Sequence, residues 1–187
     1  MNTAGKYISR ATGGTGDWNI DNDLLVGNGI IYFNTSSSQT NIIGDVITLS
    51  GGTLDIDNST GTTNVARSVN NAGTLKGSSS IVSQLNLKFN FDNQGTFTSN
   101  NTKFTFNGSS IAQTISGDLD GANSFGRLEV NNSNGLVDNS NDSLVIEDTI
   151  YLTNGVIQAK KYIVLRNGAD VLPSGGSASS YIDSCMI

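Results

Sequence analysis

The chain has 187 residues, of which 36% are hydrophobic and 14% charged, and its net charge is −6 at pH 7. Ten Lys and Arg residues in an acidic chain argue against a nucleic-acid partner, because affinity for phosphates comes mainly from cationic side chains that displace counterions. The sequence contains no histidine, which excludes Ser-His-Asp, Cys-His and imidazole-zinc sites, and its single cysteine, Cys185, cannot form an internal disulfide.

Membrane insertion is not expected. The longest nearly apolar stretch, residues 24–33, is interrupted by Gly-Asn-Gly and is far shorter than the roughly 20 residues that span a bilayer.

Apolar and polar residues alternate in several segments, which is the pattern of a strand with one face in a core and the other in water. In chain order the alternating apolar residues are Leu54 and Ile56, then Leu85, Leu87, Phe89 and Phe91, then Phe104 and Phe106, then Leu128 and Val130, then Ile150 and Leu152. No segment has the spacing of an amphipathic helix, and the residues that favour helices are sparse. The chain is therefore predicted to be nearly all β.

A glycine recurs at the corners between these segments. The corner glycines are Gly29, Gly52, Gly73, Gly95, Gly135 and Gly155, with successive spacings of 23, 21, 22, 40 and 20 residues. Gly117 divides the longest spacing, so one period runs through the chain. A period of this length is too short for a propeller blade of about 40–45 residues. Glycine supplies a bend with positive φ at no steric cost, so each corner is predicted to turn the chain in the same way.

The period suits one coil of a parallel β-helix, a solenoid in which equivalent residues of successive coils stack. The alternative is an antiparallel β-sandwich or jelly roll, in which the Asn-Gly pairs would be hairpin turns. We expect a single domain over residues 1–187, with an N-terminal cap in residues 1–23 and the C-terminal end of the solenoid in residues 175–187.

Residues 106–159 resemble the repeat regions of large secreted or surface-attached proteins of Bacteroidetes, which are often exported by the type IX secretion system. The matching motifs are FNGS at 106–109, QTISG at 113–117, Phe125, LEVNNSNG at 128–135 and LTNGVI at 152–157, and GGSASSYID at 175–183 is similar to the same family. The ending SCMI departs from the pattern, so we expect the C-terminal end of the solenoid to be truncated.

The resemblance implies a right-handed β-helix module within a longer extracellular or cell-surface chain, and it implies no activity. Regions of this family are mostly similar to stalks, adhesive surfaces or passengers.

Carboxylate pairs are the remaining candidates for catalysis. Asp55 and Asp57 lie on one face of a predicted strand, and Asp118 and Asp120 repeat the arrangement. Two carboxylates about 5–9.5 Å apart can hydrolyse a glycosidic bond. Acidic residues at this spacing are usually solubilising groups on the wet face of a strand, and Arg127 beside Glu129 is interpreted as a surface ion pair. We expect no enzyme activity.

Calcium is the metal that the sequence makes a candidate. Asp17, Asn19 and Asp21 stand at the first, third and fifth positions of an EF-hand-like loop. The loop lacks the sixth-position glycine and the final bidentate Glu, so an ordinary Asx turn competes with a Ca²⁺ site. No other cofactor is expected.

Two aromatic residues are candidates for sugar recognition. Trp18 and Tyr151 carry amphipathic rings that can stack on a pyranose, although a lone Trp more often caps a core.

The sequence thus predicts a non-catalytic structural or adhesive β-helix module that stacks end to end with neighbouring modules or with copies of itself. A polysaccharide-binding module is the alternative, with cell-surface glycan as the partner, and a polysaccharide lyase is a third reading.

Overall fold

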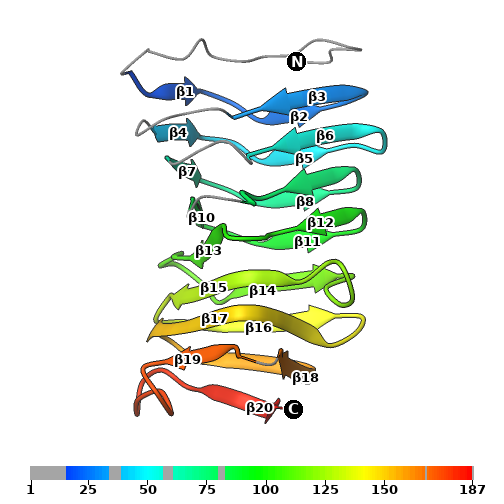
Figure 1. Cartoon of the computed structure of the whole chain (residues 1–187). Coiled ribbons are helices and arrows are strands. Elements are labelled where there is room, and N and C mark those ends of the chain that lie inside the picture. The colour runs from blue at the N-terminus through cyan, green and yellow to red at the C-terminus, as the bar shows by residue number, and fades with distance from the viewer. Residues whose placement is uncertain (1–15, 34–38, 57–60, 80–82, 167, 187) are drawn as a thin grey trace.

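The strands wind into a parallel β-solenoid of about seven turns, shown in the computed structural model of Figure 1. The structure describes residues 16–33, 39–56, 61–79, 83–166 and 168–186, and no helix occurs in these residues. Every pair between its strands is parallel, which confirms the β-helix and excludes the antiparallel sandwich. Within these ranges no helix long and apolar enough to cross a membrane is found.

Three stacks of strands run along the solenoid axis. The first stack contains β1 (Trp18–Ile20), β4 (Gln39–Ile42), β7 (Thr62–Val65), β10 (Gln84–Leu87), β13 (Lys103–Phe106), β15 (Phe125–Asn131), β17 (Leu144–Asn154) and β19 (Asp170–Leu172). The second contains β2 (Leu24–Val26), β5 (Val46–Thr48), β8 (Val69–Asn71), β11 (Phe91–Asn93), β14 (Gln113–Gly117), β16 (Leu136–Ser140), β18 (Ile157–Leu165) and β20 (Ile182–Met186). The third contains β3 (Gly29–Tyr32), β6 (Gly52–Asp55), β9 (Thr74–Lys76) and β12 (Thr96–Thr98).

The core lies inside the coils, where the alternating apolar residues of the sequence stack on one another. All of those residues except Phe89 are at most 3% exposed. Since successive side chains of a strand point to opposite faces, the polar residues between them point to the outside of the solenoid, where most are solvent-accessible and Asp55 and Thr105 are buried by their neighbours. The predicted alternation is therefore confirmed, one position excepted.

The predicted strand through residues 85–91 is broken at a corner. β10 ends at Leu87, β11 begins at Phe91, and the ring of Phe89 is 38% exposed. The buried amide of Gln113 holds the break, because its Nε2 donates to the carbonyl oxygens of Leu87 and Phe89 at 3.0 and 2.5 Å. The alternation of apolar and polar residues continues from β10 to β11, so the sequence pattern does not reveal the bend between them.

The corner glycines are required for two different reasons. Gly135 and Gly155 have φ of 88° and 96°, as the sequence predicted, and Gly29 is also positive. Gly52, Gly73 and Gly95 have no positive φ, so the predicted left-handed conformation is wrong there, although the chain does bend at Gly73 and Gly95. A Cβ added at Gly95 would lie 2.2 Å from the carbonyl oxygen of Gly73. At these corners glycine allows one coil to approach the next. The same crowding applies to Gly52, where an added Cβ would meet the Gly27 carbonyl oxygen at 2.3 Å.

The third stack ends at β12, where a cluster of phenylalanines fills the core. The ring centroid of Phe97 lies 5.0 Å from that of Phe91, 5.1 Å from Phe104 and 4.9 Å from Phe125. The side chain of Asn123 covers the edge of β12 by accepting a hydrogen bond from the Phe97 backbone N–H at 2.8 Å. Further along, Leu144–Ile146 of β17 pair with Ile163–Leu165 of β18, which joins the first and second stacks into one sheet.

Replacing Phe97 by Ala should lower the free energy of unfolding by about 3–5 kcal/mol, because it leaves a cavity among three other rings. The measurement is denaturant unfolding followed by circular dichroism. Phe89→Ala is the matched control, since that ring is partly exposed at a corner, and it should cost under about 1 kcal/mol. Equal losses for the two variants would contradict the placement of these rings.

Candidate binding face

A row of asparagine side chains crosses the outer face of the first stack. Asn41 Nδ2 donates to Asn19 Oδ1 at 3.0 Å, Asn64 to Asn41 at 2.9 Å, and Asn86 to Asn64 at 2.8 Å. These four residues, the Asn ladder, lie 22, 23 and 22 residues apart. The parallel register brings them together, because it pairs Asn19 with Asn41, Asn41 with Asn64, and Asn64 with Asn86.

The row continues past the Asn ladder with charged and hydroxyl groups. The register places Thr105, then Glu129 and then Tyr151 after Asn86. Glu129 accepts hydrogen bonds from Lys103 Nζ at 2.5 Å and from Thr153 Oγ1 at 2.8 Å. Burial opposes ionisation of Glu129, but these hydrogen bonds outweigh it and lower the pKa of the carboxyl group.

The ion pairs of this face differ from the predicted one. Arg127 pairs with Asp148 of the next coil at 2.5 Å, whereas Glu129 pairs with Lys103 of the preceding coil. The expected pair between Arg127 and Glu129 is wrong, because partners in a solenoid come from neighbouring coils. The bond from Arg127 also lowers the pKa of Asp148 against the opposing effect of burial.

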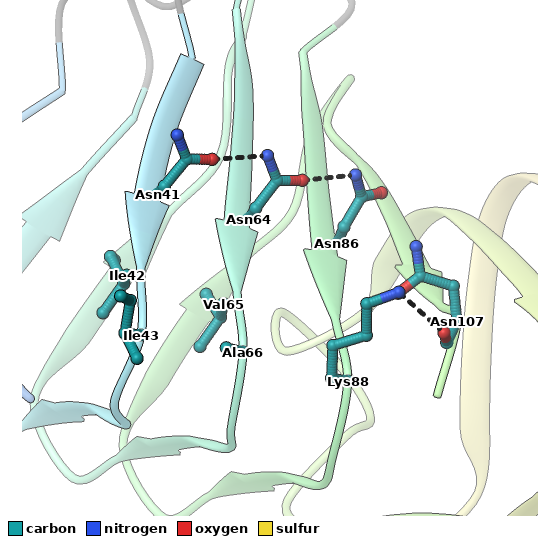
Figure 2. A pocket seen from close by; sticks show the side chains of 9 residues that line it. All are labelled: Asn41, Ile42, Ile43, Asn64, Val65, Ala66, Asn86, Lys88 and Asn107. Atoms are coloured by element: carbon teal, nitrogen blue, oxygen red, sulfur yellow. Dashed lines mark hydrogen bonds between the residues drawn. The ribbon is translucent and has the colours of Figure 1, made fainter. Parts of the chain in front are cut away.

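A groove of about 230 Å³ runs beside the Asn ladder (Figure 2). One wall is the row of amides, and the other consists of residues that follow the strands at the corner. We call it the amide groove; its lining residues are Asn41, Ile42, Ile43, Asn64, Val65, Ala66, Asn86, Lys88 and Asn107. Lys88 lies at the far end, where its Nζ donates to the Asn107 carbonyl oxygen at 3.1 Å. The side chain of Ile43 is 58% exposed.

The predicted sugar-binding aromatics do not form one platform. Trp18 lies in β1 at one end, packed edge-on against Phe33 with the ring centroids 6.1 Å apart. Tyr151 lies in β17 near the other end, with Lys103 Nζ 5.5 Å from its ring centroid. They also belong to different rows of stacked side chains. Trp18 pairs with the buried Thr40, whereas Tyr151 pairs with the outward-pointing Glu129.

The oxygen atoms of the predicted calcium loop bind the next coil. Asp17 Oδ1 accepts a hydrogen bond from the Gln39 backbone N–H at 3.0 Å, and Asn19 belongs to the Asn ladder. Asp21 is exposed at the bend after β1. The structure thus gives two of the three candidates a role in joining coils.

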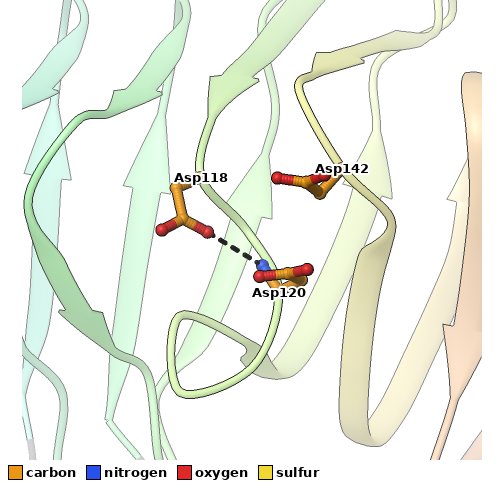
Figure 3. A group of neighbouring side chains, drawn as sticks. All are labelled: Asp118, Asp120 and Asp142. Atoms are coloured by element: carbon orange, nitrogen blue, oxygen red, sulfur yellow. Dashed lines mark hydrogen bonds between the residues drawn. The ribbon is translucent and has the colours of Figure 1, made fainter.

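Three other carboxylates come close together at a corner, as Figure 3 shows. Asp118, Asp120 and Asp142 offer oxygen atoms that lie within 4.8 Å of one another. All three are exposed, and partial desolvation of the Asp120 carboxyl group, together with the charges of Asp142 and Asp118, raises the pKa of Asp120. Oxygen ligands of this kind are those that Ca²⁺ prefers, although exposed acidic groups also gather without an ion.

The expected carboxylate pairs lie elsewhere than on the wet face of a strand. Asp118 and Asp120 follow the end of β14 in a loop, so the predicted strand is wrong there. Asp55 is buried in β6, 3.8 Å from Lys76 Nζ, and Asp57 lies outside the described residues.

The sequence pattern does not mark one buried acid, Asp138. It is fully buried in β16, between Ile115 of the preceding coil and Ala159 of the next. Its Oδ1 accepts a hydrogen bond from the Ser140 N–H at 2.9 Å, and Oδ2 has no partner among the described groups. Burial raises the pKa of this carboxyl group against the hydrogen bonds from Ser140. The segment Val137, Asp138, Asn139 mixes apolar and polar residues and gives no clear signal, because only the register shows which residue points inward.

Comparisons with family models, with curated proteins and with solved structures found no match. The relation to Bacteroidetes surface proteins therefore stays a prediction from the sequence motifs, whereas the β-solenoid is shown by the fold.

Asp138→Asn should stabilise the protein at pH 7 and flatten its pH dependence. When the pKa of an acid is higher in the folded than in the unfolded state, its protonated form favours folding. This stability is fully present below the unfolded-state pKa of about 3.9 and is lost as the pH rises through the folded-state pKa. The amide keeps the acceptor for Ser140 and cannot ionise, so the variant should be more stable than the wild type at pH 7. Denaturant unfolding between about pH 4 and pH 7 measures it.

Asp170→Asn, at an exposed position, is the control and should change little. An Asp138→Asn protein that is less stable than the wild type at pH 7 would contradict the assignment of Asp138 as an ionisable group without a compensating partner.

Proposed function

We propose that the chain is a non-catalytic structural module of a secreted or cell-surface protein, in which β-helical modules stack end to end. The observation that carries the proposal is that strands at both ends of the solenoid pair on one side only. Within the described residues β2 pairs with β5 alone, and β20 pairs with β18 alone. Edges of this kind are templates for a further strand.

The edge of β2 shows which backbone groups are available. Leu24 donates its N–H to the Asp45 carbonyl at 2.8 Å, and the Val26 carbonyl accepts the Leu49 N–H at 2.8 Å. Because backbone groups of successive strand residues point to opposite sides, the N–H and C=O of Leu25 face away from β5. A strand of a neighbouring module can bond to them as the coils bond to one another.

The charged groups of the first stack support a role without catalysis. Lys103 and Glu129 neutralise each other, as do Arg127 and Asp148, so neither pair leaves an acid or base poised for a substrate. The resemblance of residues 106–159 to repeat regions of exported proteins supports a secreted or surface location. Adhesion would follow from many copies of one lateral face along a filament.

The proposal predicts that the purified protein associates more as its concentration rises, as measured by sedimentation velocity. Leu25→Pro should shift it to the monomer, because proline removes an outward N–H while leaving the bonds between β2 and β5 in place. Leu25→Val keeps the N–H and is the matched control. Leu25→Lys, which places a charge on the edge, should also reduce association.

Thermal unfolding by circular dichroism shows whether each variant stays folded. A wild-type protein that remains monomeric at every concentration, or that associates equally well in all variants, would contradict stacking through this end.

A further inference from the structure

We propose that the amide groove binds a neutral, hydroxyl-rich polysaccharide laid along the solenoid axis. The groove crosses β4, β7, β10 and β13 on the lateral face of the first stack, between β1 and β15. The proposal therefore does not depend on end-to-end stacking, and a monomer can bind as well as a filament.

The amide wall has donors and acceptors left over for a ligand. A side-chain amide has two N–H donors and an oxygen with two lone pairs. Asn86 gives one N–H to Asn64 and accepts one bond from Gln84 at 2.7 Å, so one donor and one acceptor site remain. Asn41 likewise donates one N–H and accepts one hydrogen bond within the Asn ladder, so one donor and one acceptor site remain. A hydroxyl group, which both donates and accepts, matches this mixture.

The opposite wall is apolar, which suits the C–H faces of sugar rings. Ile43 and Ala66 are exposed at the same corner of successive coils, and Figure 2 shows them across the groove from the amides. The methylene groups of Lys88 extend this wall while its Nζ is held by the Asn107 carbonyl oxygen. A ligand in the groove would meet polar groups on one side and apolar groups on the other.

The repeat of the groove favours a polymer over a single small molecule. Rungs of the Asn ladder repeat with the strand spacing of about 4.7–4.9 Å, close to the length of one sugar ring in an extended chain. The groove holds about 230 Å³, less than the roughly 300–1,000 Å³ of pockets that enclose a small ligand. Binding would come from many weak, repeated contacts along one chain rather than from enclosure.

The charges of this face favour a neutral chain. Lys103 and Arg127 are paired with carboxylates, Lys88 donates to a backbone carbonyl, and the whole chain carries −6. An anionic polymer would find little unpaired positive charge. An extended peptide would add to a strand edge, whereas the amide groove lies on the face of a sheet.

Native affinity electrophoresis tests the proposal, with hydroxyethylcellulose as the neutral polymer and polygalacturonate as the anionic one. The wild-type protein should be retarded by hydroxyethylcellulose alone. Ala66→Arg should abolish the retardation by filling the groove without altering the Asn ladder. Ala72→Arg is the matched control, because Ala72 is exposed in the same turn of the chain at another corner, and it should be retarded as the wild type is.

Ile43→Ser is a milder second variant, which should weaken the association several-fold through loss of the apolar wall. Circular dichroism verifies that each variant is folded. The proposal is overturned if the wild type migrates unretarded, if polygalacturonate alone retards it, or if Ala66→Arg and Ile43→Ser are both retarded as strongly as Ala72→Arg.

Discussion

Parallel hydrogen bonding between successive coils is the interaction on which the rest of the structure depends. It places every residue beside the residue at the same position of the coil above and below, so Asn41 meets Asn19 and Asn64. The side chain at each position must therefore be compatible with the side chains stacked above and below it in neighbouring coils. Rows of apolar residues make the core, and a row of amides becomes the Asn ladder, because the groups that one side chain cannot satisfy are satisfied by its neighbours.

The corners are where this constraint is hardest to meet, because carbonyl groups turn away from the ladder of strands there. Buried amides take up the unpaired groups. Asn71 Nδ2 donates to Asn93 Oδ1 at 2.7 Å and to the Thr96 carbonyl at 2.9 Å, and Gln113 holds two carbonyls of the break after β10. Buried polar groups of a solenoid are thus concentrated at corners, where the backbone needs partners.

Much of the fold could be predicted from the sequence, and less of the candidate site. The alternation of Leu128 and Val130 with polar residues reports the geometry of a single strand. The glycine period reports the length of a single coil. The partners of Arg127, the approach of Asp142 to Asp118 and the burial of Asp138 depend on which residues of different coils face one another. A shift of register by one residue would change these partners and move Asp138 to the opposite face of its strand. The sequence does not mark the shortened third stack or the bend at Phe89, which set the register.

The central claim is that equivalent residues stack coil upon coil, and pulsed EPR tests it most directly. Spin labels would be placed at Asp170 and, in separate proteins, at Gln39, Thr62 or Gln84, with Cys185→Ser as the background. The register puts Gln39 six coils from Asp170, so the label separation should be about 29 Å and should shorten by about 4.8 Å for each coil nearer. Separations that do not fall in the order Gln39, Thr62, Gln84 would contradict the account.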